Sequence, residues 1–159
     1  MMIRLLTGLE FPGAPNPELQ RQPAGFDLTV QSVDRLMGRG ALDLTGENRR
    51  LPQMQQLPWP EEGPLRLNPG GYLVTYNETV QVPDDCAGLV LSRSSLLRCG
   101  AVLHTALWDP GYKGRGQGLL CVYQELQLYR DARLGQFILL GLDQTPEETY
   151  SGTYQGENL

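Results

Sequence analysis

The sequence predicts an all-β protein. Glycine occurs 19 times and proline 12 times in 159 residues, so turns are frequent. The apolar stretches between these turns are short and rich in Val, Leu and Tyr, and no long stretch has the periodicity of an amphipathic helix. Many short strands separated by turn residues are typical of a closed or sandwiched sheet. The chain length fits one domain that spans residues 1–159.

The strands are expected at regular intervals after an irregular first third. We expect the first strand at residues 26–30, after a proline-rich entry at 11–23. Residues 34–69 are less regular and predict long connections and edge strands wrapped round the core. The tail, 145–159, is polar and is expected to be mobile unless a ligand or a neighbouring subunit orders it. Further strands are predicted at 72–76, 88–92, 101–106, 118–123, 125–129 and 137–142.

Composition and charge exclude several classes of protein. No apolar stretch approaches the roughly 20 residues that span a bilayer, and the N-terminus lacks a signal-peptide pattern. We therefore expect a cytoplasmic protein with no membrane role. The net charge of -5 argues against a broad nucleic-acid surface, but it permits a local basic pocket for a small anion. The three cysteines contain no C-x-x-C pair, so neither a disulfide framework nor a zinc site is indicated.

The segment 93–98, Arg-Ser-Ser-Leu-Leu-Arg, concentrates polar side chains directly after a predicted strand. Ser94 and Ser95 are placed where serine caps a helical turn, here 96–98, by accepting hydrogen bonds from backbone N–H groups. The same geometry, flanked by Arg93 and Arg98, is also typical of an anion site for phosphates. The segment by itself leaves both interpretations open.

Asp109 and Tyr112 surround a predicted turn at Pro110-Gly111. An aspartate in this place is often only a turn former. Near a phosphate-binding segment, its carboxylate would instead orient and deprotonate a water molecule for attack on phosphorus. Tyr112 fits either a half-buried packing residue or a ring that lies under a sugar and leaves no room for a 2′-hydroxyl. Both alternatives remain open for both residues.

Five segments of the chain occur in the order of the motifs shared by dUTPases and dCTP deaminases. They are residues 24–28, 93–96, 109–114, 133–136 and 150–159. The chain resembles this family over nearly its whole length, and the segments around Asp109 and in the tail are similar to the archaeal-type dUTPases. The resemblance implies a distorted, jelly-roll-like β-barrel with one or two short helical turns. It also implies a homotrimer with active sites shared between subunits, which hydrolyses dUTP to dUMP and pyrophosphate with Mg²⁺.

The resemblance implies a role for each matching residue. Asp109 would hold the attacking water for in-line displacement at the α-phosphorus, and Tyr112 would exclude ribonucleotides. Tyr150 and Tyr154 would close over the nucleotide, so that 145–159 acts as a mobile lid. The hairpin 103–108 would read the base, largely through backbone groups. The residues expected to bind phosphate oxygens are Arg93, Ser94, Ser95, Arg98, Gln136 and Gln155.

The expected metal has few protein ligands. Mg²⁺ would be held mainly by the triphosphate and by water molecules, because this ion often keeps its waters and binds substrate phosphates. Asp27 would serve either as an indirect anchor behind the direct ligands of the metal or as a purely structural charge. The sequence predicts no other protein group at the metal.

The strand after the Asp109 turn separates the two branches of the family. Deamination of cytosine requires a glutamate there as a general acid and base. The position falls on Cys121, or on Leu119 in a different alignment, and neither side chain moves protons in this way. Glu125 shares the strand face but lies about 13 Å from Cys121. A dUTPase is therefore predicted, with a dCTP deaminase or bifunctional enzyme and a silent nucleotide-binding homologue as the alternatives.

Overall fold

The computed structural model describes residues 2–159 and is composed almost entirely of β-strands. Two short helices, α1 (Pro17–Gln20) and α2 (Ser94–Arg98), occur in this range. None of its helices is long and apolar enough to cross a membrane. The strands are β1 (Met2–Arg4), β2 (Arg21–Gln22), β3 (Gly25–Met37), β4 (Gln53–Gln56), β5 (Leu65–Leu67), β6 (Gly70–Tyr76), β7 (Val80–Gln81), β8 (Cys86–Ser92), β9 (Ala101–His104), β10 (Lys113–Gly114), β11 (Gln117–Val122), β12 (Leu126–Leu128) and β13 (Arg133–Gly141). The all-β prediction is confirmed.

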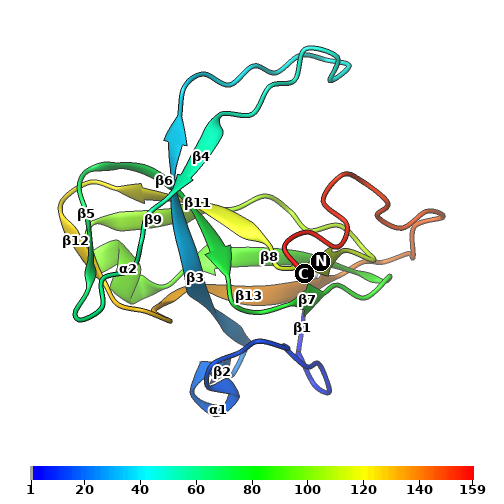
Figure 1. Cartoon of the computed structure of the whole chain (residues 1–159). Coiled ribbons are helices and arrows are strands. Elements are labelled where there is room, and N and C mark those ends of the chain that lie inside the picture. Colours follow the sequence, from blue (N-terminus) through cyan, green and yellow to red (C-terminus); the bar gives the residue numbers. More distant parts are fainter. Residues whose placement is uncertain (1) are drawn as a thin grey trace.

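Most strands belong to one nine-stranded antiparallel sheet that curls around the core (Figure 1). Its main path is β1-β13-β3-β6-β11-β9, with β2 and β4 paired to β3 and β8 paired to β13. The long strand β3 pairs with β13 in its first half and with β6 and β4 in its second half. A register shift between Val30 and Ser32 marks the change of partner. Because such an irregularity bends a strand, β3 joins the two halves of the curled sheet.

The core fills the inside of the curl. Phe26, Leu28 and Phe137 of the central strands are at most 1% exposed. Phe11 stacks on Phe26 with a ring-centroid distance of 3.9 Å, so the proline-rich entry segment covers one side of the core. Burial of this apolar surface is the main stabilising contribution to the fold.

Residues 34–69 only partly follow the expectation that they wrap round the core. β4 and β5 are short strands at the margins of sheets, as predicted. β3, however, continues to Met37, and residues 38–52 then project away from the sheet (Figure 1). The Asp43 carboxylate accepts hydrogen bonds from the N–H groups of Gly46 and Asn48, so the tip satisfies its own polar groups. We call residues 36–54 the arm.

A buried polar network fastens the entry segment to β3. Glu78 is fully buried, and its carboxylate accepts hydrogen bonds from Gln20 Nε2 at 2.6 Å and from the N–H of Thr29 at 2.9 Å. The Thr29 hydroxyl donates to it as well, at 2.5 Å. Burial raises the pKa of Glu78, and these donors partly offset that effect. The network therefore depends on one acceptor that serves three donors.

A Glu78→Ala variant is expected to lower the free energy of unfolding by about 2–4 kcal/mol, because three buried donors lose their acceptor. Urea denaturation followed by circular dichroism measures the change. Glu62→Ala is the matched control, since Glu62 is exposed and its removal is expected to change stability by less than about 0.5 kcal/mol. Equal unfolding midpoints for the two variants would contradict the role of the network.

Candidate active site

Asp109 begins a tight turn between β9 and β10. The N–H of Tyr112 donates to the carbonyl of Asp109 at 3.1 Å, and Gly111 has a φ of +81°. Proline followed by a glycine with positive φ is the sequence that a type II turn requires. The turn is attached to β8, because Gly88 and Trp108 exchange both backbone hydrogen bonds, at 2.7 and 2.9 Å. Backbone geometry therefore holds the exposed Asp109 carboxylate in position.

Tyr112 lies beneath this turn and is 3% exposed. Its ring stacks on Trp108 with centroids 5.4 Å apart, and its hydroxyl donates to Glu157 Oε1 at 2.8 Å. Burial, together with the neighbouring Glu157, raises the pKa of Tyr112, so the hydroxyl stays protonated and remains a donor. Tyr112 is thus a packing residue, and it also lines the pocket described next.

A pocket of about 330 Å³ opens beside Asp109. Four parts of the chain form its walls. They are residues 106–109 with Tyr112, the sheet residues Leu73 and Gln117, the tail residues Tyr150, Tyr154 and Glu157, and the arm residues Leu36, Leu51, Pro52 and Met54. A mostly apolar lining with a few polar groups is typical of small-molecule sites. The geometry therefore joins a solvent-accessible carboxylate to a site for a ligand with an apolar part.

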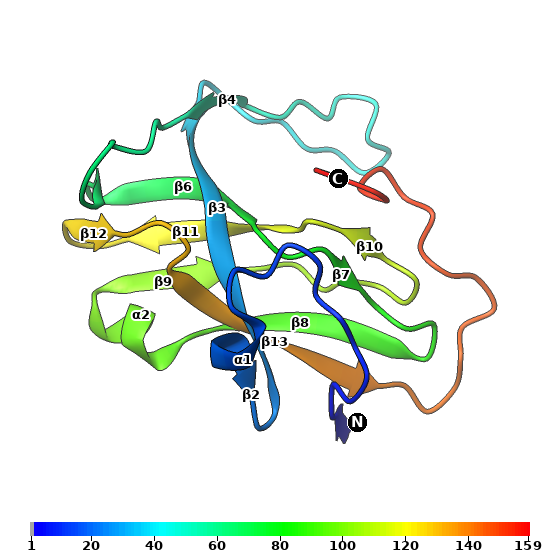
Figure 2. The same cartoon turned by 60° about the horizontal axis from the view of Figure 1, so that its bottom comes forward.

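The C-terminal tail curves back toward the body of the sheet (Figure 2), and it contacts the Asp109 turn. The N–H of Tyr150 donates to the carbonyl of Pro110 at 2.8 Å. The Gln155 amide binds the backbone twice, donating to the carbonyl of Gly111 at 3.0 Å and accepting from the N–H of Lys113 at 3.1 Å. The tail is thus in a position to cover the pocket, and contact between Gln155 and phosphates remains a prediction.

Most of the predicted phosphate-binding residues, all except Gln155, gather elsewhere, near the end of β8 that leads into α2. Arg93 Nε lies 3.0 Å from Asp27 Oδ2, and Arg133 contacts the same oxygen at 3.2 Å. Asp27 is 1% exposed, and its partner across the β13 ladder is Gln136. Burial raises the pKa of Asp27, while the two arginines act in the opposite direction. Asp27 therefore holds two guanidinium groups in place. This arrangement fits the second of the two roles expected for Asp27, that of a structural charge.

The helix α2 corrects one interpretation of the serines. The N-cap residue is Arg93, without a side-chain capping bond, and the helix begins at Ser94. The idea that Ser94 or Ser95 caps a turn at 96–98 is therefore wrong, because both serines already lie inside the helix. Their side chains are exposed, as is Arg98, which donates to the carbonyl of Ser94 at 3.3 Å. The surface of α2 thus presents hydroxyl groups and a cation to solvent.

The Asp109 turn and α2 lie toward opposite ends of β8, and Figure 2 shows α2 next to one of these ends. Gly88 pairs with Trp108, next to Asp109, whereas Arg93 follows the last residue of β8. Arg93 lies five residues further along the extended chain than Gly88, a distance of roughly 16 Å. The structure therefore brings Asp109, Tyr112, Tyr150, Tyr154 and Gln155 together at one end, and Asp27, Arg93, Ser94, Ser95, Arg98 and Gln136 at the other.

Comparison with known proteins identifies the family. A family model described as dCTP deaminase-like matches residues 8–142, which is most of the chain. The chain belongs to the dCTP deaminase-like family. A protein of Methanosarcina mazei named probable deoxyuridine 5′-triphosphate nucleotidohydrolase is 40% identical over 147 residues, which cover 91% of this chain and 86% of that protein. An Archaeoglobus fulgidus protein of the same name is 38% identical over 144 residues and covers 89% of this chain and 84% of its own length.

Solved structures agree with this family at the level of the fold. The 2′-deoxycytidine 5′-triphosphate deaminase of Agrobacterium tumefaciens superposes with a TM-score of 0.57 at 20% identity, over 86% of this chain and 43% of the deaminase. A variant dUTPase of phage phi11 of S. aureus, whose structure reveals a structural Mg(II) ion, gives 0.54 at 15% identity over 96% and 97% of the two chains. The predicted dUTPase-type barrel is therefore confirmed.

Within this dCTP deaminase-like chain, no carboxylate of the strand after the turn lines the pocket. Cys121 and Leu119, the two candidate positions for a deaminating glutamate, are half-buried on β11. Glu125 lies beyond the end of β11, where its carboxylate is 3.8 Å from Arg66. The β11 residue that does line the pocket is Gln117, whose amide donates to Thr75. An amide does not act as a general acid and base at ordinary pH.

Several contributors to the pocket were not predicted, among them Gln117, Glu157 and the arm. Gln117 shares a strand face with Leu119 and Cys121, so the two-residue alternation of a strand would have identified it. No sequence pattern predicts the position of Glu157, because only the folding of the tail brings it to Tyr112. The arm carries no signal either, since its residues lie more than 50 positions from Asp109 in the sequence.

Proposed function

We propose that this chain hydrolyses dUTP to dUMP and pyrophosphate. The proposal rests on one observation: the exposed carboxylate of Asp109 lines a mostly apolar pocket that Tyr112 also lines. A carboxylate in this place suits activation of water, and the pocket suits a nucleoside. Curated archaeal relatives at about 40% identity, which are named probable dUTP nucleotidohydrolases, support the same substrate.

In the proposed reaction, a water molecule held by Asp109 attacks the α-phosphorus in line with the leaving group. Asp109 accepts a proton from this water as the new P–O bond forms. The bond from the α-phosphorus to the bridging oxygen breaks, and its electron pair leaves on pyrophosphate. The Asp109 side chain makes no hydrogen bond or ion pair with residues 2–159, so its oxygens are available to water.

The side chains of this chain are compatible with Mg²⁺ that enters the site already bound to the triphosphate of the substrate. No three His, Cys, Asp or Glu side chains cluster in the described part of the chain. Mg²⁺ bound by phosphate oxygens and waters needs few protein ligands. When bound, the ion neutralises charge on the triphosphate and on the leaving pyrophosphate. The residues of this chain that would bind the phosphate oxygens beside it are Arg93, Ser94, Ser95, Arg98, Gln136 and Gln155; of these, the two arginines would add positive charge.

We propose further that the active site is completed in a homotrimer. In a single chain, Asp109 and Arg93 face different ends of β8, so a neighbouring copy would bring its Arg93 group to the Asp109 pocket. The outer face of the sheet offers a surface for such contacts. Leu119 is half-buried on β11, and Tyr123, directly after the end of β11, is 69% exposed. Exposed apolar surface of this kind marks sites of association.

Mixing two inactive variants tests the shared site. Asp109→Asn and Arg93→Ala, each inactive alone, are expected to recover about a quarter of wild-type activity when unfolded together and refolded as mixed trimers. Each recovered site combines an intact Asp109 from one subunit with an intact Arg93 from another. Arg98→Ala serves as a second partner variant, because it leaves the Asp27 ion pairs unchanged. Mixtures that show no recovery would assign each site to a single chain.

The proposed activity is tested by pyrophosphate release from dUTP, dCTP, dTTP and UTP with Mg²⁺ present. We expect release from dUTP and much less from UTP, whose 2′-hydroxyl would meet Tyr112. Ammonia release from dCTP without pyrophosphate release from dUTP would instead identify a deaminase, for which the pocket offers no carboxylate from β11. Binding of dUTP without pyrophosphate release would identify a silent homologue. Either of these two results would overturn the proposal.

A further inference from the structure

The arm forms one wall of the pocket beside Asp109. Leu36 on β3 and Met54 on β4 are paired across the base of the arm. Both line the pocket, together with Leu51 and Pro52. In Figure 2 the outer part of the arm and the end of the tail approach the same side of the molecule. The pocket therefore has the tail on one side and the arm on another.

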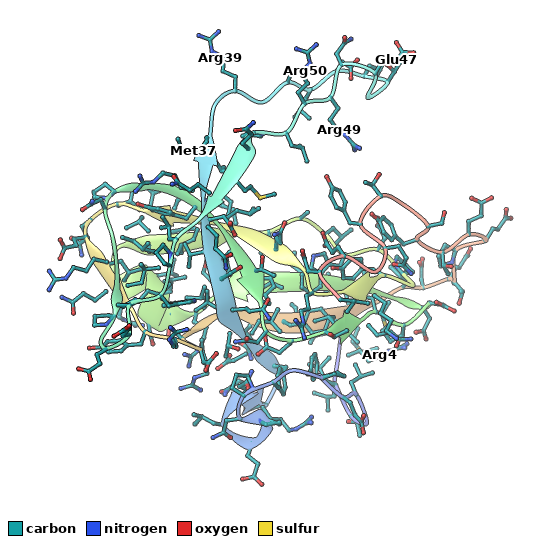
Figure 3. All side chains as sticks on the ribbon, in the orientation of Figure 1. Arg4, Met37, Arg39, Glu47, Arg49 and Arg50 are labelled. Carbon is teal, nitrogen blue, oxygen red and sulfur yellow. The ribbon has the colours of Figure 1, made fainter. Side chains whose placement is uncertain are left out.

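The apolar residues of the arm near the pocket are not needed for its own folding. Leu51 is 59% exposed and Met54 is 52% exposed, although each has a large apolar side chain. Figure 3 shows the labelled charged residues Arg39, Glu47 and Arg50 on the outer part of the arm, away from the sheet. Leu51 and Met54 thus line the pocket, where a ligand would remove their exposed apolar surface from water.

The chemistry of this wall matches the uncharged part of a nucleotide. A leucine, a proline and a methionine provide no hydrogen-bond donors for phosphate oxygens. The ring of a pyrimidine and the carbons of a deoxyribose, by contrast, gain from apolar contact. The wall therefore suits the nucleoside.

We propose that Leu51, Pro52 and Met54 of the arm contact the pyrimidine nucleoside of the bound nucleotide and set its affinity. This inference rests on the proposed hydrolysis of dUTP and adds substrate-binding residues to that site. The arm contacts are present before and during the reaction, so they contribute uniform binding energy. Their loss therefore raises KM and leaves kcat nearly unchanged.

A double variant, Leu51→Ser with Met54→Gln, tests the inference. We expect KM for dUTP to rise about tenfold, the lower end of the effect of altered apolar contacts in a binding pocket. The inhibition constant of dUMP should rise by the same factor, because dUMP carries the same nucleoside. The inhibition constant of pyrophosphate should not change. Direct titration of the protein with dUMP measures the same loss without turnover.

A shortened arm is the second test. Met37 and Gln53 are paired, so an Asn-Gly turn that replaces residues 38–52 closes the hairpin and removes Leu51 and Pro52. This variant is expected to raise KM for dUTP and the dUMP inhibition constant in the same way. Leu44→Ser is the matched control, because Leu44 is fully exposed on the same arm and does not line the pocket.

The outcomes separate this inference from the proposed function. If wild type releases no pyrophosphate from dUTP, the proposed function fails. If wild type is active and the two arm variants keep the KM of Leu44→Ser, the arm inference alone is overturned. Light scattering after gel filtration measures the molecular mass of each variant. A change in mass for the double variant would assign the arm to contacts between copies and would also overturn the inference.

Discussion

An Asp109→Asn variant is expected to hydrolyse dUTP about 10³-fold more slowly than wild type, within the range for loss of a general base. Asparagine keeps the size of the side chain but does not accept a proton from water. The fold should not change, because the Asp109 carboxylate makes no hydrogen bond or ion pair with residues 2–159 and the turn is held by backbone contacts. The initial rate of pyrophosphate release at saturating dUTP measures the effect.

Asp143→Asn is the matched control for this variant. Asp143 is another exposed aspartate, and it lies after β13, away from the pocket beside Asp109. We expect the control to keep the wild-type rate, and both variants to keep the wild-type unfolding midpoint. A rate for Asp109→Asn within threefold of wild type would remove Asp109 from the mechanism.

Removal of residues 150–159 is expected to lower kcat for dUTP on the order of 10²-fold while the number of subunits in the assembly stays the same. The tail supplies Tyr150, Tyr154 and Glu157 to the pocket, and closure over a nucleotide would exclude bulk water and hold the triphosphate for attack. Strands β1 to β13 all end before residue 150, so the sheet is complete without the tail. Steady-state kinetics and light scattering test the two parts of this prediction.

Removal of Leu159 alone provides the control for the longer truncation. Leu159 is 66% exposed and does not line the pocket, so its loss should leave kcat unchanged. An equal rate for wild type and the ten-residue truncation would contradict a lid. A truncation that dissociates the assembly would place the tail at the subunit contacts instead.

The positions of the strands could be predicted because their signals are local. Alternating apolar residues and turn residues marked β6, β8, β11 and β13 to within a few residues. The turn at Asp109 follows in the same way, since proline and glycine next to each other specify its backbone. The second half of β3 could not be predicted, because residues 31–37 become a strand only through their pairing with β6 and β4.

The sequence named the candidate site residues one by one, but it did not show how they group in space. Nothing in the order of Arg93 and Asp109 along the chain shows that β8 separates them. Gln117 required only the two-residue alternation of a strand. The arm and Glu157 depend on contacts between segments far apart in sequence, for which a single chain offers no periodic signal.

The sequence by itself determined the all-β class, the order of the five motifs, and the side chains available for chemistry, because strand alternation, turn residues and motif spacing are properties of neighbouring residues. Only the tertiary structure decided that Asp109 shares a pocket with the tail and the arm, and that Arg93 is held by Asp27 at the opposite end of β8. Long-range pairing and packing fix such contacts, since the hydrophobic effect is non-directional and does not specify which distant segments meet.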